Sequence, residues 1–412
     1  MPTGSWRAGE RDLLMGDTIS VGVNLLWLRP GRVGGSEEYA VRLLAAIDFD
    51  APVRLTLFAQ PGFSGAHPRL AERHEVVTSP VGRGRPLRVL SENTWLADQC
   101  RRRRPNLVHH FGGTVPLIGN RPSIVTIHDV QPLEFPERFG VVKRSYLRMM
   151  LPWSVRRAEA VVTVSGFCRD RLVDHLGVDP RRVRVLPAPV LASTEASANS
   201  RLTAPPLVAA NPGGVEPAPG VSTSARPPLV ADLSRPFVLY PAITYPHKNH
   251  AVLLRALARL AGRGLEVDVV VTGIPGPLDG ELDRLADALG LGERWHRLGR
   301  IPAGVLEGLY RQALAVVFPS RYEGYGLPVV EAMIRGCPVM AADAGSLPEV
   351  VGSGGYLVDP DDDASWATAI ESLLLDPRAR RNLVEAGRSR AQELAGLDPA
   401  AELCALYFEV AG

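Results

Sequence analysis

Residues 318–338 constrain the fold more than any other stretch, because they lie within a complete strand–loop–helix–strand unit. Apolar runs of strand length occupy residues 313–318 and 339–342. Between them a glycine-punctuated loop leads into a short helix, with Pro328 suited to the first helical position and Gly336 to the position just past its end. This order of elements predicts an α/β protein.

The same segment contains a candidate phosphate site. Glu323 lies in the glycine-rich loop and Glu331 in the helix, eight residues later. A glycine-rich turn that opens onto a helix N-terminus presents backbone N–H groups and a positive dipole end to an anion. Two carboxylates beside a bound phosphate would suit hydroxyl groups, and together these features suggest a nucleotide sugar. Such units also occur in α/β proteins without a ligand, so on the residues alone both interpretations stay open.

Length and charge distribution bear on domains and partners. The chain has 412 residues, more than one typical core, with 46% hydrophobic and 22% charged residues. Residues 1–190 contain 27 Lys and Arg against 18 Asp and Glu, a balance of +9. The remaining 19 basic and 26 acidic residues give −7. We therefore expect two domains, the first facing an anionic partner such as a membrane surface or a lipid phosphate, unless the asymmetry reflects only an Arg-rich composition.

Other sequence features favour a cytoplasmic location. No apolar run reaches 18 residues, and residues 1–20 lack the hydrophobic region of a signal peptide. They read instead as an N-terminal tail. The cysteines are widely scattered, show no metal-ligand spacing and fit reduced thiols: Cys100, Cys168, Cys337 and Cys404.

The first half alternates strands and helices. A strand at residues 19–26 leads through a loop containing Gly34 and Gly35 into a helix at 36–47, for which Ser36 is the expected N-cap. His128 begins the loop after an apolar strand, at the crevice where open α/β sheets bind ligands. A lone histidine there is more often structural than catalytic. Further strands are expected at residues 53–59, 107–110, 123–127, 160–164 and 183–186.

Two basic segments admit two interpretations each. Residues 101–104 are four arginines at the end of a predicted helix, where they suit either a solvated C-terminus or an anionic surface. Residues 141–158 are predicted to be helical with an interruption at Pro152, and basic residues alternate there with aromatic residues and Met. That helix suits either a core helix with a basic rim or a face lying on a membrane.

The second half repeats the alternation after a long linker. Residues 191–235 are rich in Ala, Pro and Ser and predict an unstructured linker. A strand at 237–240 is followed by Lys248 and a helix at 251–261. A lysine near a helix N-terminus opposes the helix dipole, so binding a phosphate explains it better than stability does. Strands are expected at 267–271 and 295–298, and helices at 305–313, 364–375, 377–386, 388–394 and 399–408.

The chain resembles the retaining GT-B glycosyltransferases of the glycogen-synthase-like, family-4 type. It matches their E-x7-E signature in F-P-S-R-Y-E-G-Y-G-L-P-V-V-E-A-M, and resembles them in R-V-G-G-S-E-E-Y, T-I-H-D and P-H-K-N-H. The resemblance implies two doubly wound, Rossmann-like domains facing across a cleft. These would be an acceptor-binding domain at residues 19–190 and a nucleotide-sugar-binding domain at 236–395. A C-terminal helix within 396–412 would pack on the first domain.

The resemblance also implies roles for individual residues. Lys248, the loop with Gly34 and Gly35, and the backbone amides after Glu323 would stabilise the departing diphosphate. Glu331 would bind the ribose, Glu323 the sugar hydroxyls, and His128 would lie near the sugar. The expected catalytic residues are His128, Glu323 and Lys248, and the donor site would further include Asn249, Gly273, Arg300, Gly324, Tyr325, Gly326 and Leu327.

The chain departs from the family pattern at two places. Many relatives have a Gly-Arg pair five residues before the lysine, where this chain has Ala242 and Ile243. One positive charge for the diphosphate is therefore absent or comes from elsewhere. Residues 187–190 replace a frequent Asn-Gly-Val, so contacts of that loop are not carried over.

The resemblance implies a metal-independent hexosyltransferase that needs no cofactor and binds no nucleic acid. GDP-mannose is the first expected donor, because the segment around Lys248 resembles bacterial polysaccharide mannosyltransferases, and a lipid-linked or polysaccharide acceptor is expected. Peripheral contact with the inner membrane face would accompany such an acceptor. The alternatives are a UDP-sugar enzyme acting on a small molecule, a phosphorylase or epimerase of the same architecture, and a non-catalytic sugar-nucleotide-binding subunit.

Overall fold

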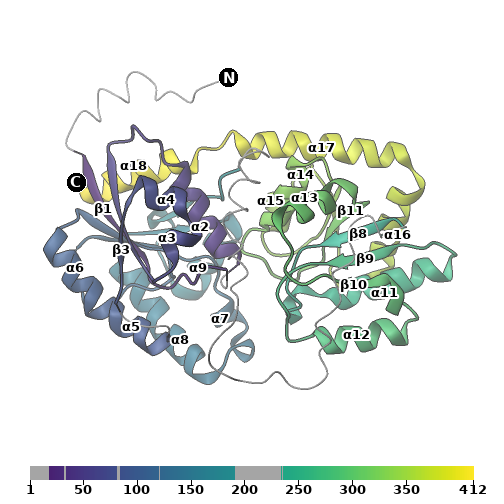
Figure 1. Ribbon diagram of the computed structural model, residues 1–412, viewed down its shortest axis with the longest axis horizontal. Helices are drawn as coiled ribbons and strands as arrows, with labels where there is room; N and C mark the ends of the chain where they lie inside the picture. The colour runs from purple at the N-terminus through teal and green to yellow at the C-terminus, as the bar shows by residue number, and fades with distance from the viewer. Residues whose placement is uncertain (1–17, 32–33, 81–83, 120, 191–232, 234) are drawn as a thin grey trace. The chain divides into compact units, whose positions relative to one another are not determined.

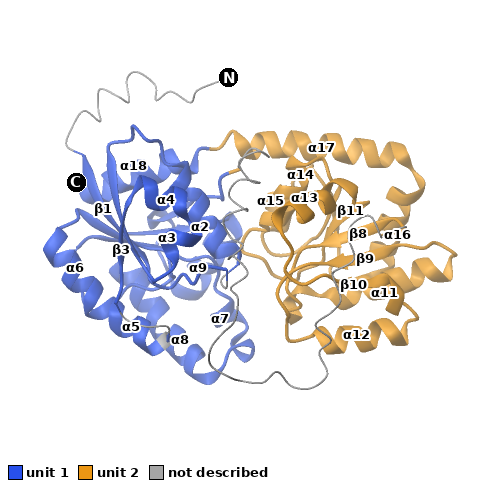
Figure 2. Ribbon diagram, in the orientation of Figure 1, with its two compact units in different colours: residues 1–189, 398–412 blue, residues 190–397 orange. Residues whose placement is uncertain are grey.

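The computed structural model describes residues 18–31, 34–80, 84–119, 121–190, 233 and 235–412. The chain divides into two compact units (Figure 2). Unit 1 comprises residues 1–189 with 398–412, and unit 2 comprises residues 190–397. The predicted tail up to residue 17 lies outside the described residues, as does the predicted linker apart from residues 233 and 235.

Unit 1 is built on a parallel sheet whose central strands are buried on both faces. Within the described residues the sheet has seven strands, and each neighbouring pair is parallel. All four residues of the strands in positions four to six are buried, which explains their apolar sequences. The order is β3 (Glu75–Thr78), β2 (Val53–Ala59), β1 (Ile19–Leu25), β4 (Leu107–His110), β5 (Ser123–Thr126), β6 (Ala160–Thr163) and β7 (Val183–Val185).

Helices cover this sheet, and the last one comes from the end of the chain (Figure 1). His109 on β4 contacts that helix, since its Nδ1 lies 2.8 Å from the Tyr407 hydroxyl, while Nε2 lies 2.7 Å from Thr126 Oγ1. The helices are α2 (Gly35–Ala46), α3 (Phe63–Ala66), α4 (Pro68–Arg73), α5 (Arg85–Asn93), α6 (Trp95–Arg103), α7 (Gln131–Glu134), α8 (Val141–Arg157), α9 (Gly166–Leu176) and α18 (Pro399–Ala411).

Unit 2 repeats the plan with six parallel strands among the described residues. They run in the order β10 (Trp295–Arg297), β9 (Asp268–Val271), β8 (Phe237–Tyr240), β11 (Ala315–Phe318), β12 (Val339–Ala342) and β13 (Tyr356–Val358). The helices are α11 (His250–Gly262), α12 (Asp279–Ala288), α13 (Ala303–Gln312), α14 (Leu327–Ile334), α15 (Leu347–Val351), α16 (Asp363–Leu375) and α17 (Pro377–Ala395).

Both sheets reverse their strand order at the centre. In unit 1 the chain runs outward from β1 to β3 and then returns to the other side at β4. In unit 2 it does the same between β8 and β11. Connections on the two sides of such a point diverge, which opens a crevice beyond the carboxyl ends of the two strands, where α/β proteins bind ligands. The prediction of two doubly wound, Rossmann-like folds is confirmed.

Three helices differ from their predictions. Helix α2 begins at Gly35 with Gly34 as its N-cap and has no side-chain cap, so Ser36 is already helical. Helix α8 continues through Pro152, because the flanking Leu151 and Val155 are buried in the core cluster and hold the turn in place. Helix α17 is one helix rather than two. Its Gly387 is buried where a Cβ would lie 3.2 Å from the Gly354 carbonyl oxygen.

Candidate active site

Tyr240 joins the two loops that flank the crevice of unit 2. This fully buried residue ends β8, and its hydroxyl lies 2.8 Å from Ser320 Oγ, just beyond β11. The same hydroxyl donates to the Lys248 carbonyl oxygen at 2.9 Å. Burial, and next the charge of Glu323, raise the pKa of Tyr240 well above its ordinary value, so the phenol stays protonated as a donor. The β8 and β11 loops are thereby held together.

Lys248 and Glu323 form an ion pair at this point. Lys248 ends a short 3-10 turn, and its Nζ lies 2.6 Å from Glu323 Oε1. The two side chains are 17% and 12% exposed. The ammonium also lies 5.2 Å from the centre of the Phe318 ring. An ammonium and a carboxylate that were predicted from separate motifs therefore share one site, and both remain accessible to a polar ligand.

The N-terminus of α14 opens beside this pair. Its N-cap Gly326 has φ 100° and provides no side-chain cap, and the first turn contains no acidic residue. Pro328 is the second helical residue rather than the first. A Cβ at Gly326 would lie 2.8 Å from Leu347 Cδ2, and this contact and the positive φ both favour glycine there. The positive end of this helix is left for an external anion.

Hydrogen bonds to the next loop hold residues 323–326 in place. Ser346 Oγ donates to the Tyr325 carbonyl oxygen at 3.1 Å, and the Ser346 amide donates to the Glu323 carbonyl oxygen at 3.3 Å. Gly345 permits this approach, because a Cβ there would lie 2.9 Å from the Glu323 nitrogen. The predicted site residues Gly324 and Leu327 lie within or next to this fixed turn, so the backbone is organised before any ligand binds.

Glu331 is oriented by a buried tyrosine. The Tyr310 hydroxyl donates to Glu331 Oε2 at 3.1 Å. Burial, and next the charge of Glu331, raise the pKa of Tyr310 well above its ordinary value. Arg335 lies 4.9 Å from the centre of the Tyr310 ring and pairs with Glu307 at 2.5 Å. The carboxylate of Glu331 thus accepts a fixed hydrogen bond and retains capacity for ligand hydroxyls.

The other predicted residues of unit 2 lie around this centre in different roles. Asn249 is the N-cap of α11 with φ 55°, and its Nδ2 donates to the Pro360 carbonyl oxygen at 2.5 Å. Its side chain therefore stabilises the contact between these two loops of unit 2. Gly273 has φ 142°, and a Cβ there would lie 3.3 Å from the Ile243 nitrogen. Arg300 is exposed beyond β10.

Sequence reasoning missed a polar cluster beyond β8, β9 and β10. Arg297 pairs with Asp279 at 2.8 Å and with Asp283 at 2.6 Å, and the Thr244 hydroxyl donates to Asp279. A small cavity of about 30 Å³ lies at this cluster and also touches Gly273. No motif marks these residues, since each is an ordinary charged or hydroxyl residue until the fold brings them together.

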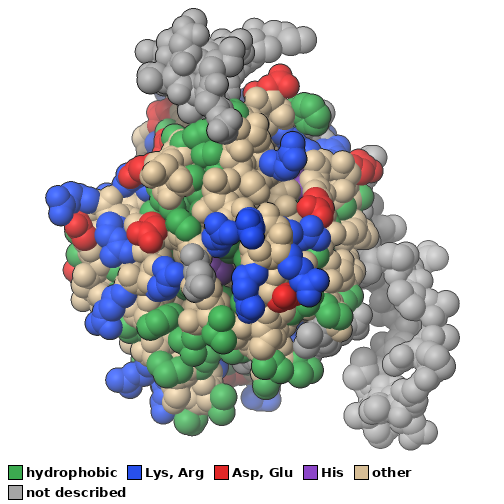
Figure 3. Space-filling model, turned by 90° about the vertical axis from the view of Figure 1, so that its left-hand side faces the viewer, with side chains coloured by type: hydrophobic (Ala, Val, Ile, Leu, Met, Phe, Trp, Pro, Cys, Tyr) green, Lys and Arg blue, Asp and Glu red, His purple; other side chains and the backbone are tan. Residues whose placement is uncertain are grey.

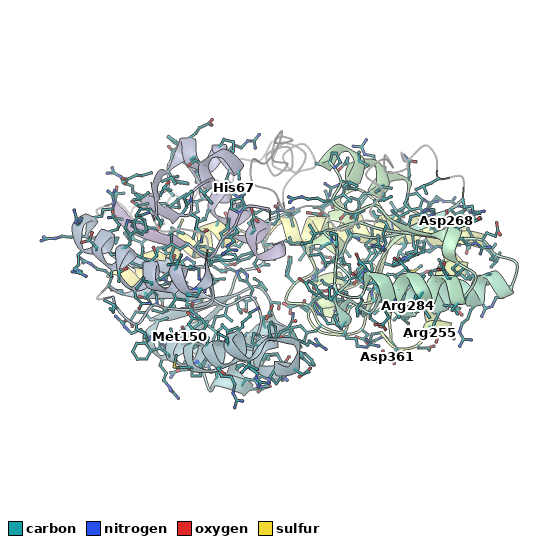
Figure 4. All side chains as sticks on the ribbon, turned by 60° about the horizontal axis from the view of Figure 1, so that its bottom comes forward. His67, Met150, Arg255, Asp268, Arg284 and Asp361 are labelled. Carbon is teal, nitrogen blue, oxygen red and sulfur yellow. The ribbon has the colours of Figure 1, made fainter. Side chains whose placement is uncertain are left out.

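In unit 1, a buried carboxylate supports the loop that contains Gly34 and Gly35. Glu37 is 4% exposed, and both of its oxygens accept from the Gly31 amide, at 3.0 and 3.1 Å. Its Oε1 also lies 3.1 Å from Nε2 of His67, which is labelled in Figure 4. Glu37 lies in the first turn of α2. A Cβ on Gly34 would meet nothing within 4 Å, but its φ of 77° favours glycine.

His128 lies where the loops after β1, β4 and β5 meet. Its ring is 6.0 Å from Trp27 and 5.2 Å from Tyr39, measured between ring centres. Its Nε2 lies 3.2 Å from the Phe111 carbonyl oxygen, so Nε2 carries the proton and Nδ1 is left as an acceptor. Burial lowers the pKa of His128 to about 4, so the ring is neutral at neutral pH. Asp129 accepts from the Gln131 amide at 3.1 Å and holds the following turn.

Comparison with known proteins agrees with this architecture. The family described as "Glycosyltransferase Family 4" matches residues 33–191, and the family "Glycosyl transferases group 1" matches residues 222–390. The O-antigen chain mannosyltransferase RfbU of Salmonella typhimurium is 26% identical over 361 residues, covering 84% of this chain and 89% of that protein. The MMP alpha-(1->4)-mannosyltransferase of Mycolicibacterium hassiacum is 34% identical over 292 residues, covering 68% of each.

Among solved structures, Anabaena HepE in complex with UDP-glucose is similar with a TM-score of 0.68 and 19% sequence identity. The match covers 95% of this chain and 99% of that one. Two doubly wound units of this kind define the GT-B fold class. The chain belongs to the family-4, group-1 glycosyltransferases, and it is a glycosyltransferase, as its sequence predicted.

The lowered pKa of His128 predicts acid sensitivity. The unfolded chain binds a proton on this side chain near pH 6.5, whereas the folded chain binds it only near pH 4. The stability contributed by neutral His128 is therefore complete above pH 6.5 and lost as the pH falls toward 4. We expect the free energy of unfolding, measured by urea titration, to fall less steeply over this range in His128→Asn than in the native chain. An unchanged slope would contradict this assignment.

Proposed function

We propose that the chain is a retaining glycosyltransferase that moves a hexosyl unit from a nucleotide sugar to a polysaccharide or lipid-linked acceptor. The observation that carries the proposal is the pair of Lys248 and Glu323, 2.6 Å apart beside the uncapped N-terminus of α14. Cationic and amide donors on one side and a carboxylate on the other suit a diphosphate and a sugar respectively.

In this proposal Lys248 and the backbone amides near Gly326 stabilise the negative charge that develops on the departing diphosphate. Such preorganised electrostatic stabilisation is usually the largest single term in catalysis. Only two lysines occur in the sequence, Lys143 and Lys248, among 46 basic residues. A compact ammonium at position 248, in a chain whose basic residues are arginines apart from Lys143 and Lys248, supports a specific role for that group.

The other groups would hold the donor. Glu331, oriented by Tyr310, would accept from the ribose hydroxyls, and Glu323 from the sugar hydroxyls. His128 would accept at Nδ1 from a sugar hydroxyl. None of these residues is assigned as a nucleophile. The acceptor would attack on the face from which the diphosphate departs, transferring its proton to the departing phosphate oxygen, so that the anomeric configuration is retained.

GDP-mannose is our first choice of donor. Two of the most similar proteins are named as mannosyltransferases, one acting on the O-antigen chain. A structural neighbour was solved with UDP-glucose, which keeps a UDP-sugar as the alternative. The cluster of Thr244, Asp279 and Arg297 lies beyond strands whose turns would border the base. We propose the N-terminal unit as the acceptor-binding part and the C-terminal unit as the donor-binding part.

The two lysines provide an internally controlled test of the donor site. We expect GDP or UDP to protect Lys248 from reductive methylation, read by mass spectrometry, while Lys143 reacts unchanged. Replacing Lys248 with Ala should slow donor turnover about 100-fold, because a charge is lost at the departing group. Lys143→Ala is the matched control and should retain full turnover. Equal protection of both lysines, or of neither, would count against the site.

A donor panel tests the reaction class. Among the residues that the structure describes, no three His, Cys, Asp or Glu side chains are grouped to hold a metal ion. We propose a reaction without a metal. We expect GDP-mannose to release GDP in the presence of EDTA, faster than UDP-sugars release UDP, with product of retained anomeric configuration by NMR. Glu323→Gln should slow this release. Binding of a donor without release from any panel member would favour the non-catalytic alternative.

Helix α8 supports a peripheral membrane contact at the cytoplasmic face. Val142 is 85% and Met149 62% exposed, and their spacing of seven residues places both on one side of the helix, in line with Trp153. Basic residues Lys143, Arg144 and Arg148 lie between them in the sequence. No helix in the described part of the chain is long and apolar enough to cross a membrane. We propose that α8 lies on an anionic bilayer surface.

Vesicle flotation tests this contact. The double substitution Val142→Glu and Met149→Glu should reduce binding to phosphatidylglycerol vesicles at least several-fold, because it places two anionic groups against an anionic surface. The matched control is Leu375→Glu with Leu397→Glu, two exposed leucines of unit 2. An equal loss in both double variants would assign the effect to net charge rather than to α8.

A further inference from the structure

A pocket of about 560 Å³ lies in unit 1, and its lining includes none of the residues assigned to sugar transfer. One wall is apolar and includes Leu96, Val108 and Val115. The floor holds polar side chains, and arginines line the remainder: Glu92, His110, Ser123, Arg101, Arg104, Arg121 and Arg157. Its volume falls within the range of small-molecule sites, and exceeds what a single phosphate fills.

The topology of the sheet explains why these arginines converge. Arg104 lies three residues before β4, Arg121 two residues before β5, and Arg157 three residues before β6. These strands are parallel neighbours, so their amino ends lie along one edge of the sheet. His128 follows the carboxyl end of β5 and therefore belongs to the opposite edge. The arginines of the pocket therefore lie at the edge opposite to His128, and the pocket extends from there to His110, at the carboxyl end of β4.

The pocket arginines differ from neighbouring arginines in their charge partners. Within the described part of the chain, none of these four guanidinium groups has a carboxylate oxygen within 4.0 Å. Arg102 and Arg103 on the same helix differ, since they pair with Asp98 at 2.8 Å and Glu75 at 3.1 Å. Favourable contact with the C-terminal dipole of α6 accounts for its own arginines, but not for those before β5 and β6. Figure 3 shows Lys and Arg side chains gathered around a hollow with a histidine visible inside.

The floor of the pocket adds a neutral donor. Asn24 Oδ1 accepts from the Leu26 amide, so its Nδ2 is the donor toward His110 Nδ1 at 3.1 Å. His110 Nε2 then carries the ring proton. The acid of the floor, Glu92, is 4% exposed, lies 3.8 Å from Arg88, and has a pKa raised by burial. Its ion-pair partner Arg88 is not among the residues that line the pocket.

We propose that this pocket binds the phosphate ester of an apolar chain. The guanidinium groups form forked, charge-assisted hydrogen bonds that suit a phosphate, and His110 supplies a further donor. The apolar wall and the spare volume accommodate the first part of a hydrocarbon chain. This proposal is independent of the function proposed above, since it involves none of the donor-site residues.

Calorimetric titration of the full chain with three probes tests the ligand class. Hexyl phosphate should bind more tightly than inorganic phosphate and more tightly than hexanol, because only the ester satisfies both halves of the pocket. If inorganic phosphate binds as well as the ester, the apolar half of the proposal is wrong. If hexanol does, the anionic half is wrong.

Two matched double variants locate the site. Arg101→Ala with Arg121→Ala should weaken hexyl phosphate binding about tenfold or more, since charge-assisted hydrogen bonds are lost. Arg102→Ala with Arg103→Ala removes the same charge outside the pocket and should leave binding unchanged. An equal loss in both pairs would overturn the proposal. Donor turnover should be unaffected in the first pair, which separates failure of this site from failure of the transfer site.

A final arm distinguishes the source of the ester. Flotation with phosphatidylcholine vesicles, with and without phosphatidic acid, compares the native chain with the Arg101 and Arg121 variant. A gain from phosphatidic acid that this variant loses supports a membrane lipid as occupant. Hexyl phosphate binding without that gain supports a soluble ester. Absence of both overturns the pocket as a binding site.

Discussion

The hydrogen bonds of the Tyr240 hydroxyl are the interaction on which the candidate site depends. A strand order that reverses between β8 and β11 opens a crevice, but it does not by itself fix how the two loops lie. A single buried hydroxyl bonds one loop through Ser320 and the other through the Lys248 carbonyl. Residues that are 75 positions apart, Lys248 and Glu323, are thereby brought within 2.6 Å. A phenol suits this role because its long, rigid ring reaches from the strand end while its hydroxyl can donate and accept.

Backbone geometry supplies the second constraint. The turn before α14 packs closely against the β12–α15 loop, and these contacts together with positive φ angles disfavour side chains at Gly326 and Gly345. A similar arrangement occurs in unit 1, where the buried carboxylate of Glu37 accepts the hydrogen bond of the Gly31 amide. In both units hydrogen bonds within the fold fix these polar backbone groups, and in the proposed reaction this would limit reorganisation as charge develops on the diphosphate.

Loops and helices that depend on neighbouring residues could be predicted from the sequence, whereas contacts between distant residues could not. Gly and Pro residues mark the ends of elements within a few positions of the chain. They were sufficient to predict the loop with Glu323, the helix with Glu331 and the alternation of strands and helices. Tyr310 and Tyr240 were read only as parts of a helix and a strand, since their site contacts lie 21 and 80 residues away. The continuity of α8 through Pro152 was missed for a related reason. Burial of Leu151 and Val155 outweighs a local signal that favours a break.

Because Ala242 and Ile243 replace the Gly-Arg pair of many relatives, the positive charge of the site rests on the lysine of the Lys248–Glu323 pair. Ala242 is buried, and the Ile243 amide packs against Gly273. These two residues therefore contribute packing and no positive charge. Lys248 is the cation that pairs with Glu323, three residues before the α14 N-cap Gly326. Its partner Glu323 carries one charge, and the pair remains partly exposed, so the attraction between them is modest. A diphosphate presents more charge and more acceptors than one carboxylate. It can therefore compete for the ammonium and leave Glu323 free to accept hydrogen bonds from a sugar.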